Sequence, residues 1–518
     1  MSRTRSSIVN FFTAVIGQIF GLLASFIARI FFVKILGSEY LGLNGLFTNI
    51  LTVLSLAELG VGSAITYSLY EPLAKKDYEK CKSLMKLYKY IYLVIGTFIF
   101  VAGICISPFL SIFIKEMPNI DNLNIIFILF VANTAISYFY SYKRNLIIAD
   151  QNRYIATIYR YAFYFALNVA QIVFLIITKN YFVYLILQII STFLENYFIS
   201  KKADKMYPFL SDKNVEKLDK ESISDIKKNT KAMMMHKIGG TVVSSTDNII
   251  LSKFVGLEAV GLYSNYYMVI YALNLFFTQL YNSLTPSVGN LWATSTTNKR
   301  VDIFKKIDFL TFWIYSFSSI CLLYLFNPFI EIWVGKEYLF DFNVILILTI
   351  NFYITGMRKS VLTFRDATGL FYRDRWKSIV EALINLIVSI VLAINFGTFG
   401  VFLGTFISSI TTSVWVEPYI LFKDGFKIKT SLYFKTYFKR LMITIIICII
   451  TFIPIKLIVV NNIYLAFIVK LIICLLLPNL ILYIMYRNSD EFKYFYDKFF
   501  KKILKKLKKS KVNACLNF

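Results

Sequence analysis

Several ionisable side chains lie inside long apolar runs, where a charge is costly and therefore informative. Arg29 lies in a run that begins near Ile8, Glu58 lies in the next run, and Asp247 and Asn248 lie in a later one. A charge at the centre of a bilayer costs at least about 2.5 to 3.5 kcal/mol, so each is expected to face a cavity or a partner. A guanidinium holds anions, and a carboxylate accepts cations or protons. These residues therefore predict a pathway for a charged substrate or an ion.

Further charges lie closer to the ends of their apolar runs: Glu195, Glu381, Arg160, Lys237 and Arg358. Each has two interpretations, because such a residue either lines a pathway or forms an interhelical pair, and the basic ones also reach the interface by snorkelling. Lys470 lies near the middle of the last run, where a lipid-facing lysine is costly. We expect it to meet a lipid phosphate or a carboxylate in a groove.

These residues must be positioned by membrane helices. With 57% hydrophobic and 17% charged residues and a mean hydropathy of +0.62, the chain is too apolar for a soluble globule. Apolar runs long enough to cross a bilayer recur from end to end, which predicts an all-α polytopic membrane protein. We predict fourteen spans, at about 8–36, 41–70, 87–114, 123–149, 153–177, 181–203, 231–255, 259–291, 307–327, 341–364, 374–396, 398–422, 435–456 and 461–486.

One motif occurs twice and sets the domain organisation. The spacing K-x-x-G-x-E-x-x-G-L runs from Lys34 to Leu43 and returns from Lys253 to Leu262, each time between two apolar runs. Such a repeat predicts two six-helix lobes with a cleft between them, and an even number of spans makes the lobes parallel. The alignment places Arg29 on Asn248 and Ala28 on Asp247, which predicts a central Arg29–Asp247 pair. The expected domains are a lobe at 1–203, a linker at 204–230, a lobe at 231–422, accessory helices at 423–486 and a basic tail at 487–518.

The positive charge is distributed on one side of the predicted membrane. The net charge is +26, and 46 of the 56 Lys and Arg lie on the side of residue 1, against six on the opposite side and four within spans. This asymmetry follows the positive-inside rule and predicts cytoplasmic termini; it explains the charge better than nucleic-acid binding does. After Arg487, aromatic residues such as Phe492 alternate with lysines at helical spacing, which predicts a tail helix on anionic lipids.

Several classes of protein are disfavoured. The sequence has no G-x-x-x-x-G-K-[ST] motif for nucleotide phosphates, its six cysteines form no C-x-x-C pair, and its longest predicted outer loop, 327–341, is short for a membrane glycosyltransferase. We therefore expect no enzyme activity, no cofactor and no metal site. His236, the only histidine, is either part of a proton relay or an interfacial polar residue.

Two segments resemble a known family. LGSEYLGLNGLFTNILTVLSLAELGVGSAITYSLYEP, from Leu36 to Pro72, and TDNIILSKFVGLEAVGLYSN, from Thr246 to Asn265, are similar to Wzx-type oligosaccharide repeat-unit flippases of the multidrug/oligosaccharidyl-lipid/polysaccharide (MOP) exporter superfamily. The resemblance implies a MATE-like fold in a bacterial inner membrane. It also implies alternating-access transport of an undecaprenyl-pyrophosphate-linked oligosaccharide for capsule, exopolysaccharide or O-antigen assembly. The family's cationic cleft then maps onto Arg29, and its lipid-tail groove onto the last two spans with Lys470.

The sequence leaves alternatives open. A cation-coupled multidrug exporter has the same fold, although Arg29 disfavours cationic drugs. Transport of the peptidoglycan precursor lipid II is another alternative, and a membrane polymerase or ligase is a third. Coupling to H⁺ or Na⁺ through Asp247 or Glu58 is energetically reasonable, because a membrane potential supplies about 2.3 kcal/mol per charge per 100 mV.

Overall fold

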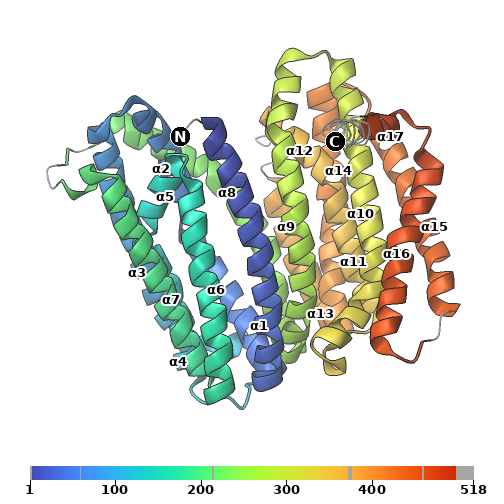
Figure 1. Ribbon diagram of the computed structural model, residues 1–518, viewed down its shortest axis with the longest axis horizontal. Coiled ribbons are helices and arrows are strands. Elements are labelled where there is room, and N and C mark those ends of the chain that lie inside the picture. Colours follow the sequence, from blue (N-terminus) through green and yellow to red (C-terminus); the bar gives the residue numbers. More distant parts are fainter. Residues whose placement is uncertain are drawn as a thin grey trace, which may run out of the picture. The chain divides into compact units, whose positions relative to one another are not determined.

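The protein is helical throughout the part that the structure describes. A computed structural model describes residues 3–58, 60–212, 215–216, 218–370, 376–457 and 460–497. Within these ranges every regular element is a helix and there is no strand (Figure 1). The prediction of an all-α polytopic membrane protein is therefore confirmed.

Nine helical segments of the described chain are long and apolar enough to cross a membrane, or ten if the bent pair Leu123–Tyr138 and Ser141–Ala149 forms one span. Phe12–Glu58 covers most of the first predicted span and the first part of the second, and Lys377–Phe426 covers nearly all of 374–396 and the whole of 398–422. Together these segments cover every predicted span except 231–255 and 259–291, which lie in long helices that did not meet the same test. The count of fourteen stays a prediction.

The contacts divide the chain into two compact units. Unit 1 comprises Met1–Tyr267 with Ser378–Gly404, and unit 2 comprises Met268–Lys377 with Thr405–Phe518. This division does not follow the sequence repeat, because α9 (Leu257–Thr294) and α13 (Lys377–Thr411) each contribute to both units. The lobes at 1–203 and 231–422 therefore remain a prediction.

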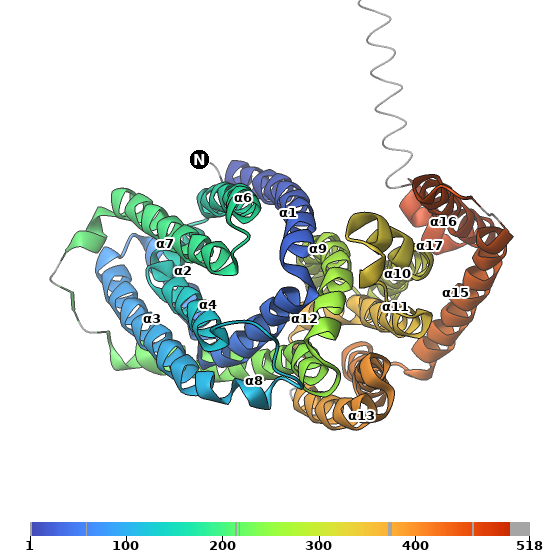
Figure 2. The same ribbon diagram turned by 90° about the horizontal axis from the view of Figure 1, so that it is seen from below.

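Unit 1 is a bundle of long helices, seen end on in Figure 2. Its other helices are α1 (Arg3–Leu54), α2 (Val61–Lys75), α3 (Tyr78–Ile106), α4 (Leu123–Tyr138), α5 (Ser141–Ala149), α6 (Arg153–Thr178), α7 (Tyr181–Met206) and α8 (Lys220–Ile250), with short 3₁₀ segments at Ser55–Glu58, Ser107–Ile112 and Pro208–Ser211. Only Lys179 and Asn180 connect α6 and α7. Gly17 and Gly21 on α1 allow close packing, because both face the ring of Tyr161 on α6.

Unit 2 contains the accessory helices. Its other helices are α10 (Thr297–Trp333), α11 (Phe342–Met357), α12 (Lys359–Thr368), α14 (Ser413–Ile420), α15 (Ser431–Leu457), α16 (Ile463–Tyr486) and α17 (Asp490–Phe495), with a 3₁₀ segment at Lys336–Tyr338 and a π-helical turn at Leu421–Phe426. Both α15 and α16 pack against α10.

The repeated motif forms a reciprocal contact inside unit 1. Its first glycine turns the chain in each copy, with φ of 85° at Gly37 and 138° at Gly256, values that L side chains rarely adopt. Its second glycine, Gly42, faces the backbone carbonyl of Leu257, and Gly261 in turn faces the carbonyl of Ser38. The spacing K-x-x-G-x-E-x-x-G-L thus places a turn and a close helix contact in each copy.

The predicted second span is broken near its middle. The helix α1 passes into a 3₁₀ turn at Ser55–Glu58, and α2 begins after Gly60, which has φ of 82°. A break exposes backbone groups that a regular helix would satisfy, so such breaks in membrane proteins occur where the chain lines a polar interior. The break places the carboxylate of Glu58 beside α3.

The linker between the predicted lobes is partly helical and docked. The helix α8 begins at Lys220, capped by Asp219, and continues into the predicted seventh span. Ile226 is buried and Leu218 is partly buried against a core that contains Ile65 and Leu84. The apolar points of the linker therefore pack on unit 1.

The beginning of the tail also packs on protein. Phe492 on α17 stacks on Trp313 of α10 with ring centroids 5.7 Å apart, and lies 5.6 Å from the ring of Tyr483 on α16. The prediction that the tail helix lies on anionic lipids stays a prediction. The remainder of the predicted tail helix, from residue 498, lies outside the described residues.

Candidate translocation site

The first predicted pathway residue, Arg29, is bound by neutral partners. Its guanidinium lies on α1, half-buried, and donates to the Ser264 hydroxyl at 2.9 Å, with a longer contact of 3.5 Å to the side-chain oxygen of Asn265. Tyr164 and Tyr184 lie within electrostatic range. Among the described residues no carboxylate pairs with this guanidinium, so its positive charge is available to an anionic group.

The second predicted centre surrounds Asp247 on α8. The neighbouring Thr246 hydroxyl donates to the side-chain oxygen of Asn385 on α13 at 3.2 Å. Asp247 lies within electrostatic range of Tyr263 on α9. The side-chain oxygen of Asn248 is buried and has no hydrogen-bond partner among the described residues. A buried acceptor without a partner requires an explanation, such as water or an ion.

The two centres meet on α9. Arg29 contacts Ser264 and Asn265, while Asp247 lies within electrostatic range of Tyr263. The basic and the acidic residue therefore lie beside three successive residues of one helix. The contacts that the structure gives Arg29 do not include Asp247. The predicted direct pair between them is therefore replaced, in the described part of the chain, by an arrangement through α9.

Glu58 ends a chain of hydrogen bonds inside unit 1. The Tyr92 hydroxyl donates to Glu58 at 2.9 Å, the Tyr88 hydroxyl lies 3.3 Å from Tyr92, and Asn145 on α5 donates to Tyr88 at 2.5 Å. Tyr88 and Tyr92 are buried. The carboxylate is thus linked by hydroxyl groups to the elbow between α4 and α5, which is an arrangement that can bind a proton or a small cation.

Glu195 and Arg358 lie in two ion pairs of similar design. In unit 1, Arg144 on α5 reaches Glu195 on α7 at 2.7 Å. In unit 2, Arg358, at the junction of α11 and α12, binds Glu417 on α14 through two hydrogen bonds of 2.9 and 2.7 Å. Each pair ties the elbow of a broken helix to the end of a later span, which favours a structural role for both.

Glu417 has two further basic neighbours besides Arg358. It is fully buried; Lys377 approaches it at 2.6 Å and Arg365 at 3.7 Å. Sequence reasoning did not single out Glu417, although it lies within the predicted span 398–422. It also missed the buried pair of Asp308 on α10 and Arg440 on α15. The signal was present in each case, because all three ionisable residues lie inside predicted spans.

The other predicted residues are placed as follows. Arg160 on α6 is exposed and lies within electrostatic range of Arg144, and Glu381 on α13 is buried. The backbone of Lys237 lies in α8, but its side chain is outside the described residues, as is that of His236. Lys470 is half-buried on α16. The predicted roles of these residues stay predictions.

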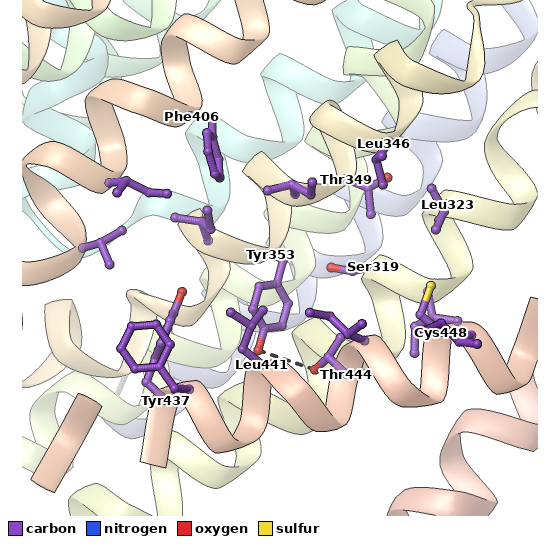
Figure 3. Close-up of a pocket in the computed structure, with 18 residues that line it drawn as sticks. Ser319, Leu323, Leu346, Thr349, Tyr353, Phe406, Tyr437, Leu441, Thr444 and Cys448 are labelled. Atoms are coloured by element: carbon purple, nitrogen blue, oxygen red, sulfur yellow. Dashed lines mark hydrogen bonds between the residues drawn. The ribbon is translucent and has the colours of Figure 1, made fainter. Parts of the chain in front are cut away.

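An apolar pocket lies within unit 2. It has a volume of about 480 Å³ and is bounded by α10, α11, the end of α13, α14 and α15. Figure 3 shows Tyr353, Phe406 and Leu441 directed toward it, with Thr444 and Tyr353 in a long hydrogen-bond contact of 3.5 Å. Lys470 does not line this pocket. The accessory helix α15 forms one wall, and the buried Asp308–Arg440 pair ties that helix to α10.

Ser360 completes this attachment of α15. Its hydroxyl donates to Asp308 at 2.7 Å, and the Arg440 guanidinium lies 5.5 Å from the ring centroid of Phe312. A buried ion pair is tolerated only where further contacts satisfy its charges, and these contacts supply that. The attachment therefore fixes the wall of the apolar pocket.

Known structures with the same fold include transporters. The chain is similar to the lipid II flippase MurJ in an inward closed conformation, with a TM-score of 0.65 and 15% identity over 94% of this chain and 99% of that one. It is also similar to a multidrug resistance MATE family transporter of the MOP superfamily, inward-facing, with a TM-score of 0.63 and 14% identity over 81% and 98%. A third similar structure is a point mutant of the Vibrio cholerae MATE transporter VcmN, with a TM-score of 0.55 and 14% identity over 83% of this chain and 99% of that one. At these identities the likeness shows the fold.

The family comes from a separate comparison. No curated protein sequence matches the chain. A family model described as polysaccharide biosynthesis protein matches residues 7–292, more than half of the chain and both copies of the repeated motif. The resemblance seen in the sequence is thereby confirmed at the level of the family and the fold. This chain belongs to the polysaccharide biosynthesis protein family and has the fold of the MOP exporter superfamily.

Proposed function

We propose that this protein is a flippase for undecaprenyl-pyrophosphate-linked oligosaccharide repeat units, which it moves from the inner to the outer leaflet of a bacterial cell membrane by alternating access. The family and the fold support a lipid-linked substrate. The observation that carries the proposal is the guanidinium of Arg29, held inside the first apolar run by neutral Ser264 and Asn265. A pyrophosphate supplies the negative charge that this cation lacks among the described residues.

The apolar pocket of unit 2 suits the other half of the substrate. A polyprenyl chain is a long hydrocarbon, and the pocket of about 480 Å³ presents Leu323, Leu346, Phe406 and Leu441. Burying such a chain against protein needs only matching apolar surface. The lipid tail then occupies a site bounded by the accessory helix α15.

A cation resets the carrier in this proposal. Asp247, Asn248 and Asn385 provide oxygen atoms of the kind that H⁺ or Na⁺ requires, and Glu58 provides a second carboxylate. A potential of about 100 mV supplies about 2.3 kcal/mol for each charge moved. Both termini lie in the cytoplasm, where the basic tail beyond α17 meets anionic lipids.

Deletion of the gene tests the proposal. The lipid-linked repeat unit should accumulate on the cytoplasmic leaflet and surface polysaccharide should be lost, with recovery by the wild-type gene. Normal surface polysaccharide in the deletion strain would contradict the proposal. Rescue of a conditional lipid II flippase mutant would instead assign the peptidoglycan precursor as the substrate.

A cation-coupled drug exporter is the second candidate, because the fold is shared with MATE transporters and Asp247 is an acid inside the membrane. Arg29 disfavours it, since cationic drugs are repelled by a guanidinium. Drug sensitivity measured in a pump-deficient host separates the two candidates. We expect this protein to have no enzyme activity.

A further inference from the structure

A polar pocket at one end of unit 1 has no role in the arrangement described so far. It has a volume of about 370 Å³ and lies where α2, α3 and α8 meet. Small-molecule sites are typically about 300 to 1,000 Å³, so the pocket is large enough for a small ligand. The residues that line it are Tyr67, Ser68, Tyr70, Glu71, Pro72, Lys75, Asp77, Lys80, Leu84, Ser222 and Asp225.

The chain builds this pocket from a tight connection. The helix α2 ends at Lys75, and Asp77 caps α3 by accepting from the Lys80 amide at 3.0 Å. The Asp77 amide in turn donates to the Pro72 carbonyl at 2.9 Å. These bonds fix the last turn of α2 against the first turn of α3, so the lining residues of both helices are held in a defined arrangement.

The third wall comes from the linker. Ser222 and Asp225 lie on the first turns of α8, and Ile226 beside them is buried in the core of unit 1. This burial fixes the orientation of the turn that carries Asp225.

Two tyrosines of the pocket are exposed. Tyr67 is 67% exposed and Tyr70 is 50% exposed, and their ring centroids lie 6.1 Å apart with the rings nearly perpendicular. Tyrosines in an interfacial belt face lipid headgroups. These two instead share a pocket with three carboxylates, those of Glu71, Asp77 and Asp225.

The lining chemistry selects the ligand. Glu71 and Lys75 form an exposed ion pair of 2.6 Å. Both keep further hydrogen-bonding capacity for a polar ligand, because a carboxylate accepts several hydrogen bonds and an ammonium group donates three. The lining holds three carboxylates and two lysines, so the opposite charges largely cancel and favour neither an anionic nor a cationic ligand. A neutral ligand with many hydroxyl groups satisfies both kinds of group. Its C–H faces can pack on the electron-rich faces of tyrosine rings.

We propose that this pocket binds the sugar part of the substrate, as a carbohydrate-recognition site on the side of the membrane where the substrate is loaded. The inference rests on the proposed function, which supplies a saccharide on that side. The pocket is formed by the same end of unit 1 that carries the N-terminus, as Figure 1 shows for α2. Recognition of the sugar is thereby separated from recognition of the pyrophosphate by Arg29.

The test is a binding measurement on the full-length protein in nanodiscs of neutral lipid. The probe is the water-soluble oligosaccharide released by mild acid from the host's own lipid-linked repeat units, and inorganic pyrophosphate is titrated separately. Wild-type protein should bind the oligosaccharide. Tyr67→Ala and Asp225→Asn should each weaken this binding about tenfold, which corresponds to about 1.4 kcal/mol, and should leave pyrophosphate binding unchanged.

Two controls make the result specific. Tyr67→Phe keeps the ring and should retain most of the affinity. Tyr90→Ala removes a ring that is 66% exposed on α3 but does not line the pocket, and should bind as wild type. Thermal unfolding of each variant checks that it is folded.

The inference is overturned if wild-type protein does not bind the oligosaccharide, or if Tyr67→Ala and Asp225→Asn bind it as tightly as wild type. Unchanged affinity in the variants would leave the flippase proposal intact. Normal surface polysaccharide in the deletion strain would contradict the flippase proposal without changing the binding result, so the two failures are distinguishable.

Discussion

Gly42 and Gly261, the equivalent glycines of the repeated motif, meet each other. A Cβ atom on Gly261 would lie 3.3 Å from the backbone nitrogen of Gly42, and it would collide with the Ser38 carbonyl. A Cβ atom on Gly42 would collide with the Leu257 carbonyl. The two copies of the motif therefore pack backbone on backbone, which only glycine allows.

Gly42→Ala should destabilise the protein by about 1 to 3 kcal/mol, because backbone must shift to admit the methyl group. Thermal unfolding of the purified protein measures this. Gly289→Ala is the matched control, because the added Cβ atom would lie at an ordinary distance of 3.8 Å from the Ala367 carbonyl oxygen. That control should be neutral or stabilising, because alanine favours a helix over glycine. Equal stability of Gly42→Ala and wild type would contradict the contact.

Glu417→Gln should be more damaging to stability than any change at an exposed ion pair. The substitution removes the buried carboxylate that Arg358 and Lys377 contact, and breaking a buried pair costs about 3 to 5 kcal/mol. Asp302→Asn on α10 is the control, because Asp302 is half-exposed in its pair with Lys306 and should cost about 0.5 kcal/mol. Chemical or thermal unfolding compares them. Similar losses for both variants would contradict a structural role for Glu417.

Filling the apolar pocket of unit 2 should impair transport. Leu441→Trp places an indole into the pocket that we assign to the polyprenyl tail, and transport should fall about tenfold. Met442→Trp is the matched control, because Met442 is the next residue, is 52% exposed and does not line the pocket. Surface polysaccharide in the complemented deletion strain reports the difference. Full activity of Leu441→Trp would exclude the pocket as the tail site.

Asp247→Asn should remove the dependence of transport on an ion gradient. The substitution keeps the size of the side chain and removes its charge, so the cation loses a carboxylate ligand. Transport into liposomes is measured with imposed H⁺ and Na⁺ gradients. Glu58→Gln is compared in the same assay. Retained gradient dependence in Asp247→Asn, with loss in Glu58→Gln, would assign coupling to the carboxylate beside Tyr92.

The sequence predicted the membrane helices, the repeat and the family, because apolar length and motif spacing are written directly in the chain. It also identified which positions carry charge inside the membrane. It could not predict their partners. Lipid is as apolar as leucine, so the hydropathy of a span does not reveal which face meets another helix. The contact of Arg29 with Ser264 is an example.

Two charged residues that the sequence analysis did not single out also have partners that the sequence does not reveal. Glu417 and Arg440 lie near the ends of predicted spans, where a charged residue is normally interpreted as lying at the membrane interface. Their partners, Lys377 and Asp308, become neighbours only in the folded chain. The docking of the linker involves Leu218 and Ile226, isolated apolar residues in a charged segment. Single contacts of this kind leave no periodic signal.

The most direct test of the account is the rate at which purified protein in liposomes moves a polyprenyl-pyrophosphate-linked oligosaccharide between leaflets, compared between Arg29→Ala and Lys34→Ala. Both substitutions remove a cation from α1, but Lys34 is exposed and Arg29 is held inside by Ser264. Arg29→Ala should slow transport by at least about tenfold, with Arg29→Lys intermediate, because a lysine cannot reproduce the geometry of a guanidinium. Lys34→Ala should transport as wild type. Transport at the wild-type rate by Arg29→Ala would contradict the central claim that this guanidinium receives the pyrophosphate.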